Sequence, residues 1–302
     1  MTISRFPHGI SSFGIPQLGS GALTTTGNVF FVDDSGSDSN DGLSPEHPFS
    51  TLDYAIGRCT ASHGDIIIVM PGHAETAPAA GVLLDQAGIS IIGLGQGRAR
   101  PCITAHASAA VDLIAVSGAN CYIENIRLVG GAAGTTALVD AGAADLTVVN
   151  CVLEHGAAPT IAFTIPAAGL RTTIKGCTFR GTANGPATGI KLEAAAASDL
   201  MVQDCDFLYF TATGLDTAGI SSAFSNKDVL ISRCRFVGMN TTAISFASSA
   251  NGLIEYCTAA SYASTTVAEI FDPGDAGIVE CYAAGEGIDK SGGRTPATTA
   301  TP

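Results

Sequence analysis

Three acidic side chains could supply the carboxylate pair that a glycoside hydrolase needs. Asp204 and Asp206 flank Cys205, and Glu154 follows Cys151 by three residues. Hydrolysis of a glycosidic bond requires two carboxyl groups about 5–10 Å apart in a groove that binds sugar. If Cys205 points inward from a strand, Asp204 and Asp206 share the outward face, so a pair is geometrically possible. The alternative interpretation is that all three belong to a solvated outer face.

Arginines close to these carboxylates favour ion pairs over catalysis. Arg233 and Arg235 flank a cysteine one repeat later, where they are expected to pair with Asp204 and Asp206. Exposed pairs of this kind contribute little to stability, but they help to fix packing or an interface. The chain also has no Trp and only 6 Tyr with which to stack on sugar rings. We therefore expect a protein without enzymatic activity.

A second acidic group lies in a loop near the N-terminus. Asp34, Asp38 and Asp41 are interspersed with Gly, Ser and Asn, which makes them candidate calcium ligands. The loop lacks the distal Glu of a calcium-binding loop, so turns capped by Asx side chains are the simpler interpretation. The six His share no metal-ligand spacing, and His73 and Glu75 are interpreted as surface residues after a turn. No metal or other cofactor is expected.

The nine Cys are an odd number with no close CxxC pair, so they indicate neither zinc nor redox chemistry. We interpret them as buried free thiols of a chain that folds in a reducing cytosol. Six of them follow apolar residues in repeated stretches such as LTVVNCVL, TTIKGCTF and VLISRCRF, at intervals of 23–29 residues. This period is within the range of solenoid repeats. The aligned residues are Cys151, Cys177, Cys205, Cys234, Cys257 and Cys281.

Each repeat contains two or three short strand-like runs separated by small residues, and none is long enough for a helix. This pattern describes one coil of a parallel β-helix, in which equivalent residues stack about 4.8 Å apart. A Cys in each coil, with Phe or Leu two residues later, then forms an inward ladder, and Phe179, Phe207 and Phe236 stack beside it. We interpret the ladder as packing, and a thiolate stack that holds a metal is the alternative.

Segments outside the repeats are expected to close or extend the solenoid. Residues 49–60 contain a capping-box-like Ser50 and Asp53 followed by apolar residues at helical spacing, which predicts a short helix at the N-terminal end. Residues 1–28 are apolar but aperiodic, so we expect an extended arm that orders against a partner, with a disordered leader as the alternative. The apolar arm residues are Phe6, Pro7, Ile10, Phe13, Ile15, Pro16 and Leu18.

Composition excludes several classes of protein. The chain has 302 residues, a net charge of −13 and only 14% charged residues. So few basic residues argue against nucleic acid as a partner. Hydrophobic residues make up 46%, too many for a disordered chain, and no apolar run reaches the length of a membrane span. Low charge in a soluble chain is explained if part of the surface lies against sister subunits, so an oligomer is expected.

A recognisable pattern spans residues 29–72. Its elements are Asp38, Asn40-Asp41-Gly42, Ser44-Pro45, Pro48-Phe49, Thr51-Leu52, Ala55-Ile56, Gly64-Asp65 and Pro71-Gly72. The pattern resembles the N-terminal signature of right-handed parallel β-helix proteins of the pectate-lyase-like superfamily. The resemblance implies an all-β, right-handed parallel β-helix solenoid with an N-terminal capping helix and an extended N-terminal arm. The expected segments are the arm (1–28), the signature and capping helix (29–65), the β-helix (66–287) and a low-complexity tail (288–302), either flexible or an exchanged strand.

The leader, SRFPHGISSFGIPQLGSG, is similar to that of tailed-phage proteins associated with the virion. This resemblance implies a non-enzymatic capsid decoration or cement protein on the capsid exterior, made in the bacterial host cytoplasm. Its partners would be sister subunits in a homotrimer and the major capsid protein, with no nucleic acid and no membrane. A tailspike-like receptor-binding protein that cleaves glycans, as glycosidase or lyase, is the alternative, although the basic residues match no lyase motif. A tail or neck component is a further alternative.

Overall fold

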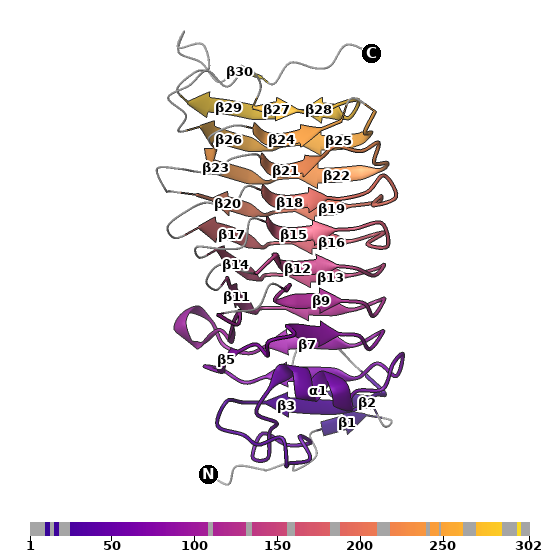
Figure 1. Cartoon of the computed structure of the whole chain (residues 1–302), viewed down its shortest axis with the longest axis vertical. Helices are drawn as coiled ribbons and strands as arrows, with labels where there is room; N and C mark the ends of the chain where they lie inside the picture. Colours follow the sequence, from indigo (N-terminus) through magenta and orange to yellow (C-terminus); the bar gives the residue numbers. More distant parts are fainter. Residues whose placement is uncertain are drawn as a thin grey trace.

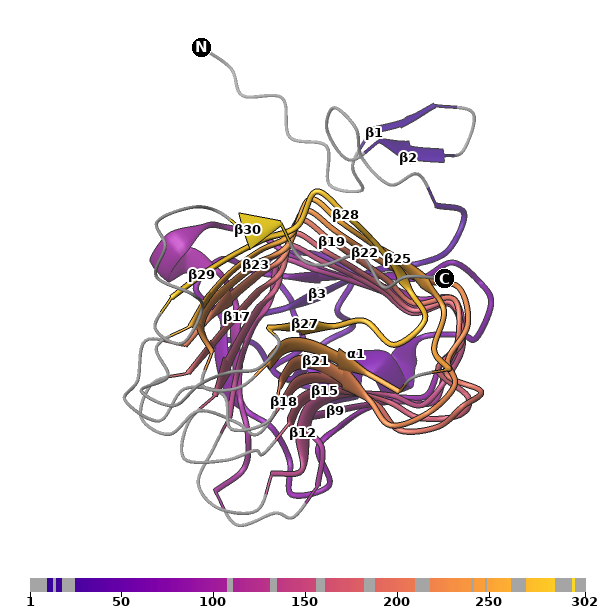
Figure 2. The ribbon, with the colours of Figure 1, turned by 90° about the horizontal axis from the view of Figure 1, so that it is seen from above.

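The computed structural model describes residues 10–12, 15–17, 25–107, 111–130, 135–155, 161–181, 188–209, 218–239, 242–247, 249–261, 270–285 and 295–296. Short strands wind around a common interior to form a solenoid with three faces (Figures 1 and 2). Each coil passes through three sheets in turn. Within the solenoid, strands pair in parallel with their counterparts one coil earlier and one coil later, so equivalent side chains form ladders.

The strands of the three sheets follow one another at regular intervals along the chain. The first sheet holds β3 (Val29–Val32), β4 (Ile66–Val69), β7 (Ser90–Gly93), β10 (Tyr122–Glu124), β13 (Thr147–Val149), β16 (Thr173–Lys175), β19 (Met201–Gln203), β22 (Val229–Ser232), β25 (Gly252–Glu255) and β28 (Gly277–Val279). The second sheet holds β5 (Ala74–Thr76), β8 (Cys102–Thr104), β11 (Arg127–Val129), β14 (Val152–His155), β17 (Thr178–Gly181), β20 (Asp206–Leu208), β23 (Arg235–Met239), β26 (Thr258–Ser261), β29 (Tyr282–Gly285) and β30 (Thr295–Pro296). The third sheet holds β6 (Val82–Leu84), β9 (Ile114–Val116), β12 (Ala137–Ala141), β15 (Ile161–Ile165), β18 (Thr188–Leu192), β21 (Ala218–Ser222), β24 (Thr242–Phe246) and β27 (Phe271–Asp272).

In successive coils from β10 onward, two residues join the first-sheet strand to the second-sheet strand, and the first of them has the left-handed backbone conformation. Stretches such as LTVVNCVL are therefore two strands, β13 and β14, joined by a sharp bend rather than one strand. Gly, Asn and Asp tolerate this conformation best. The bend residues, with φ from 48° to 61°, are Asn125, Asn150, Gly176, Asp204, Arg233, Tyr256 and Glu280.

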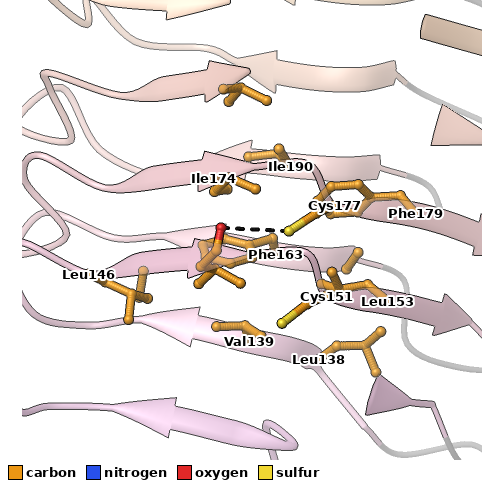
Figure 3. Close-up of a cluster of buried hydrophobic side chains, with 14 of the residues drawn as sticks. Leu138, Val139, Leu146, Cys151, Leu153, Phe163, Ile174, Cys177, Phe179 and Ile190 are labelled. Carbon is orange, nitrogen blue, oxygen red and sulfur yellow. Dashed lines mark hydrogen bonds between the residues drawn. The ribbon is translucent and has the colours of Figure 1, made fainter. Parts of the chain in front are cut away.

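Aromatic rings and thiols stack along the interior. Phe179, Phe207 and Phe236 lie in successive second-sheet strands, with ring centroids 4.5 and 4.6 Å apart. Phe271 of β27 then meets Phe236 edge-on, in a region where Ala259 is the in-register partner of Phe236. Figure 3 shows two of the cysteines among Leu, Val, Ile and Phe side chains from all three sheets. The six aligned cysteines are at most 1% exposed.

The helix α1 (Leu52–Arg58) covers the N-terminal end, where Leu52, Ala55 and Ile56 are buried. Its N-cap is Thr51, whose hydroxyl accepts a hydrogen bond from the backbone N–H of Tyr54, and not Ser50 as the capping-box pattern suggested. Ser50 instead donates its N–H and hydroxyl to Asp38.

Two short segments lie outside the parallel ladders. β1 (Ile10–Ser12) and β2 (Ile15–Gln17) pair with each other in antiparallel fashion. β30 pairs antiparallel with β29, so Thr295 lies opposite Ala283. Among the residues placed in the structure, no helix is long and apolar enough to cross a membrane.

Candidate functional site

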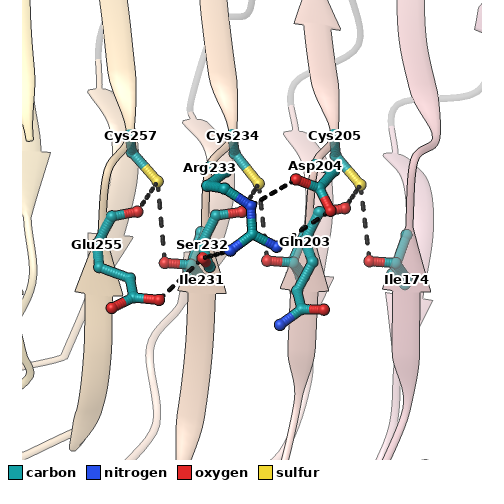
Figure 4. A network of polar contacts seen from close by, with 11 residues as sticks. Ile174, Gln203, Asp204, Cys205, Ile231, Ser232, Arg233, Cys234, Glu255 and Cys257 are labelled. Atoms are coloured by element: carbon teal, nitrogen blue, oxygen red, sulfur yellow. Dashed lines mark hydrogen bonds and ion pairs between the residues drawn. The ribbon is translucent and has the colours of Figure 1, made fainter.

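Arginines of the next coil hold both Asp204 and Asp206. Arg233 Nε lies 2.7 Å from Asp204 Oδ1, and Arg235 Nε lies 2.8 Å from Asp206 Oδ1. Figure 4 shows the first pair, which joins two neighbouring bends on the outer surface. The hydrogen bond from Arg233 lowers the pKa of Asp204 below its ordinary value. Both carboxylates therefore lie in cross-coil ion pairs, as the register of the repeats indicated.

Glu154 lies between two guanidinium groups and is only 8% exposed. Arg127 Nη2 is 3.0 Å from Glu154 Oε1, and Arg180 Nε is 2.8 Å from Glu154 Oε2. Burial alone raises the pKa of Glu154, but the hydrogen bonds from Arg127 and Arg180 outweigh it, so the pKa is below its ordinary value. The interpretation of Glu154 as a solvated residue is wrong, because the coils on either side each place an arginine against it.

The register keeps Glu154 apart from the other two carboxylates. Glu154 lies opposite Arg180, and Arg180 lies opposite Leu208, so an apolar residue takes the equivalent position in the coil of Asp206. Two coils correspond to about 10 Å along the solenoid axis. A glycoside hydrolase places a carboxyl group of raised pKa beside a second, ionised one. Glu154 and Asp206 therefore lie two coils apart, each with an arginine partner, and the pKa of Glu154 is lowered rather than raised.

The acidic loop near the N-terminus uses its carboxylates to cap turns. Asp38 Oδ1 accepts hydrogen bonds from Ser50 N at 2.9 Å and from Thr51 N at 3.3 Å. Asp41 Oδ1 accepts one from Leu43 N at 3.1 Å, whereas Asp34 lies at the exposed surface. Over the described ranges, no group of three or more His, Cys, Asp or Glu is arranged to hold a metal ion.

His73 is buried and Glu75 is partly buried, with only 8% of the Glu75 side chain exposed. The His73 side chain is 0% exposed, and its Nε2 lies 3.6 Å from Glu75 Oε2. Glu75 accepts a hydrogen bond from the backbone N–H of Leu52, the first residue of α1, at 3.1 Å. Their interpretation as surface residues is wrong, because the N-terminus of α1 lies against Glu75.

Each thiol of the ladder lies between two backbone carbonyls at a bend. Cys205 Sγ is 3.2 Å from Gln203 O and 3.6 Å from Ile174 O in the preceding coil. Cys234 repeats the arrangement one coil later, as Figure 4 shows. A thiol donates to carbonyls, whereas a metal-binding thiolate has no proton to donate. This geometry is that of a packed and hydrogen-bonded thiol.

A row of polar side chains on the outer face of the third sheet was not among the predicted site residues. Thr164 Oγ1 donates a hydrogen bond to Asp140 Oδ1 at 2.8 Å, and Lys191 Nζ lies 3.2 Å from Glu193 Oε1. A polar residue recurs at the fourth position of ALVDA, IAFTI, TGIKL, AGISS and TAISF, and this recurrence could have revealed the row. Its members, in register from coil to coil, are Asp140, Thr164, Lys191, Ser221, Ser245 and Asp272.

A hollow of about 640 Å³ lies along this row. Lys191, Ser221 and Ser245 contribute polar groups to its lining, and Phe224 and Phe246 contribute aromatic rings. Such a combination suits a small or extended polar ligand.

The carboxyl group of Asp140 lies in the same row as the lining residues. Burial raises its pKa, and the neighbouring Asp112 and Glu193 raise it further, although the hydrogen bond from Thr164 lowers it. A carboxyl group of raised pKa can act as a general acid.

The N-terminal arm is described only in part. Ile10 lies in β1, and Ile15 and Pro16 lie in β2. The other apolar residues named for the arm lie outside the described residues, and they are Phe6, Pro7, Phe13 and Leu18.

Solved structures share the fold at low sequence identity. A pectate lyase, Pel9A, superposes with a TM-score of 0.57 at 12% identity, over 87% of this chain and 78% of that one. A rhamnogalacturonan lyase gives a TM-score of 0.48 at 16% identity, covering 78% and 74%. The pectin methylesterase of Aspergillus niger gives 0.48 at 14% identity, covering 91% of both chains. No curated protein matches the sequence. At these identities the likeness concerns the fold alone.

A family model described as the right-handed beta helix region matches residues 103–279, more than half of the chain. This match and the superposition with the pectate lyase confirm the predicted all-β, right-handed parallel β-helix. The chain therefore belongs to the family of proteins with a right-handed β-helix region.

Proposed function

We propose that the protein is a non-enzymatic structural component of a bacteriophage virion, a decoration or cement protein on the capsid exterior. The observation that carries the proposal is the pairing of Glu154, Asp204 and Asp206 with arginines of neighbouring coils. Carboxylates held in this way link coils and are poorly suited to act as acid, base or nucleophile. The resemblance of the leader to virion-associated proteins of tailed phages supports the proposal that the chain is part of a phage particle.

In this proposal, the apolar arm and one face of the solenoid bury surface against the major capsid protein and sister subunits. Binding that favours the assembled shell stabilises it by mass action. The low content of charged residues, 14%, supports a surface that is partly covered, and a homotrimer is the expected state.

The test compares phage particles with and without the gene that encodes this chain. Cryo-electron microscopy of complete particles is expected to show β-helical rods on the capsid exterior, and particles without the gene should lose them. Purified protein should bind the depleted particles, whereas a variant without residues 1–28 should fold but not bind. Absence of the chain from purified complete particles would overturn the proposal, and density on the tail or neck would overturn the capsid location.

A second function, tailspike-like binding and cleavage of a glycan, is supported by the hollow and the polar row that contains Asp140. The test is incubation with the surface polysaccharide of the host, followed by detection of released oligosaccharides. Cleavage at this site predicts that Asp140→Asn abolishes release, while Asp206→Asn, the matched change on the second sheet, leaves it intact. If the unaltered protein releases no oligosaccharide, the hypothesis that it cleaves a glycan is rejected.

A further inference from the structure

The two ends of the solenoid differ in whether the backbone N–H and C=O groups of the edge strand in the first sheet have hydrogen-bond partners. At the N-terminal end, the outer edge of β3 is covered, because Phe31 N–H donates to Gly42 O and Phe49 N–H donates to Phe31 O. The interior at that end is covered by α1. The edge of the first sheet is thus closed where the solenoid begins.

At the other end, the described residues leave the edge of β28 unpaired. Val279 O accepts a hydrogen bond from Tyr256 N at 3.0 Å, so Val279 faces the preceding coil. Adjacent residues of a strand direct their backbone groups to opposite sides, so the N–H and C=O of Ile278 point away from β25. Within the described residues, no strand pairs with this edge of β28, whereas β30 pairs with β29 in the second sheet. An open edge is a template for an additional strand.

The sequence around this end is mainly acidic, and the next basic residues along the chain are Lys290 and Arg294 in the tail. Residues 236–289 contain no Lys or Arg and seven Asp or Glu. Asp275 and Glu280 flank β28 at its two ends, and both are exposed. In the described part of the chain neither forms an ion pair, in contrast to Asp204 and Asp206 in earlier coils. The edge therefore favours a partner strand that carries positive charge.

Apolar side chains next to the edge supply contact area. Tyr256 is 49% exposed and Val279 is 42% exposed, and their backbones are hydrogen-bonded to each other. Exposed aromatic residues of this kind are common at the centre of protein interfaces. In an added strand of alternating apolar and basic residues, the basic residues would face outward beside Val279 and the flanking carboxylates, and the apolar residues would face inward with Ile278.

We propose that β28, with Tyr256, Asp275 and Glu280, is a docking edge for an extended, lysine- or arginine-bearing segment of another protein, which adds to the first sheet as a strand. Strand addition uses main-chain hydrogen bonds for affinity and side chains for specificity. The proposal goes beyond the proposed function, because it concerns this end of the solenoid whether or not the chain is part of a virion.

The test uses the full chain and a fluorescein-labelled eight-residue peptide of alternating lysine and valine. Fluorescence anisotropy should show saturable binding. The same peptide with N-methyl groups along one edge keeps its charge but cannot pair on that edge, so it should bind at least about tenfold more weakly. Equal binding of the two peptides would show charge attraction alone and overturn the proposal.

Charge-reversed variants locate the site. The double variant Asp275→Lys, Glu280→Lys should lose about tenfold in affinity, because two attractions become repulsions. The matched control, Asp34→Lys with Glu46→Lys, makes the same change in exposed residues at the other end and should keep the affinity. Asp275→Asn with Glu280→Gln gives a milder second variant if the first folds poorly. Equal losses in both double variants, or self-association of the native protein through β28 that excludes the peptide, would refute the assignment.

Discussion

His155 should make the protein less stable in acid by a calculable amount. The side chain is fully buried at the end of β14, its ring packs against Tyr209 with centroids 5.9 Å apart, and its Nδ1 lies 3.2 Å from Arg180 O. A carbonyl only accepts hydrogen bonds, so the neutral ring carries its proton on Nδ1. Burial lowers the pKa of His155 from 6.5 to about 4, although the hydrogen bond to Arg180 O opposes this shift.

The sign of the change in stability with pH follows from how many protons the folded and unfolded chains bind. Above pH 6.5 the ring is neutral in both the folded and the unfolded chain, and its contribution to stability is fully present. As the pH falls from 6.5 towards 4, the unfolded chain binds a proton that the folded chain does not, so stability is lost. The whole shift corresponds to about 3 kcal/mol, and about 2.5 kcal/mol of this is lost between pH 7 and pH 4.5.

Urea unfolding followed by circular dichroism at pH 7 and pH 4.5 measures this loss. His155→Gln keeps a side-chain N–H for the Arg180 carbonyl but does not titrate, so its loss between the two pH values should be about 2.5 kcal/mol smaller than that of the unaltered protein. His47→Gln, which removes an exposed histidine, should behave like the unaltered protein. The m-values of the variants and the unaltered protein should be equal, because only then does a shift of the urea midpoint report a change in stability. If His155→Gln and the unaltered protein lose the same free energy, the reasoning is wrong.

Two further predictions concern the interior. Gly238→Ala should lower the free energy of unfolding in urea by about 2–4 kcal/mol, because the added Cβ would clash with the Tyr209 carbonyl oxygen at a φ of +82°. Its control, Gly176→Ala, has a φ of +61° and nothing nearer than 3.9 Å, so it should cost only about 1 kcal/mol, and equal costs would contradict the clash. Cys205 and Cys234 should resist a thiol reagent in the native protein, while all nine cysteines react after denaturation. Rapid native labelling of these two would refute their inward position.

The repeating coil could be predicted because its clearest sequence pattern lies within a few consecutive residues of each coil. A cysteine two residues before Phe or Leu, as in Cys177 and Phe179, marks the inward face by the period of two. The bends were hidden, because Arg233, Tyr256 and Glu280 take a left-handed conformation that such residues rarely adopt. Only the neighbouring coils enforce it, and the sequence of one coil does not contain that information.

The polar contacts depended on register between coils. The pairing of Arg233 with Asp204 follows from aligned repeats, so it was accessible to sequence reasoning. The burial of Glu154 was not, because it needs Arg127 and Arg180 to reach it from both sides at the same level. Asp140 could have been found from the polar residue that recurs at the fourth position of the third-sheet strands, but its carboxylate neighbours, Asp112 and Glu193, come from other positions in the chain.

The constant register of the bends makes the length of the rod adjustable in discrete steps. Removing residues 177–204 would join Gly176 to Cys205 and place an intact coil directly on its second neighbour, shortening the rod by about 4.8 Å with its cross-section unchanged. A deletion of equal size that begins in a strand of one sheet and ends in a strand of another would not join equivalent positions, so the parallel pairing of the following coils would be lost. Duplication or loss of one coil can therefore lengthen or shorten the solenoid in steps of one strand spacing, while the residues that form its two ends stay the same.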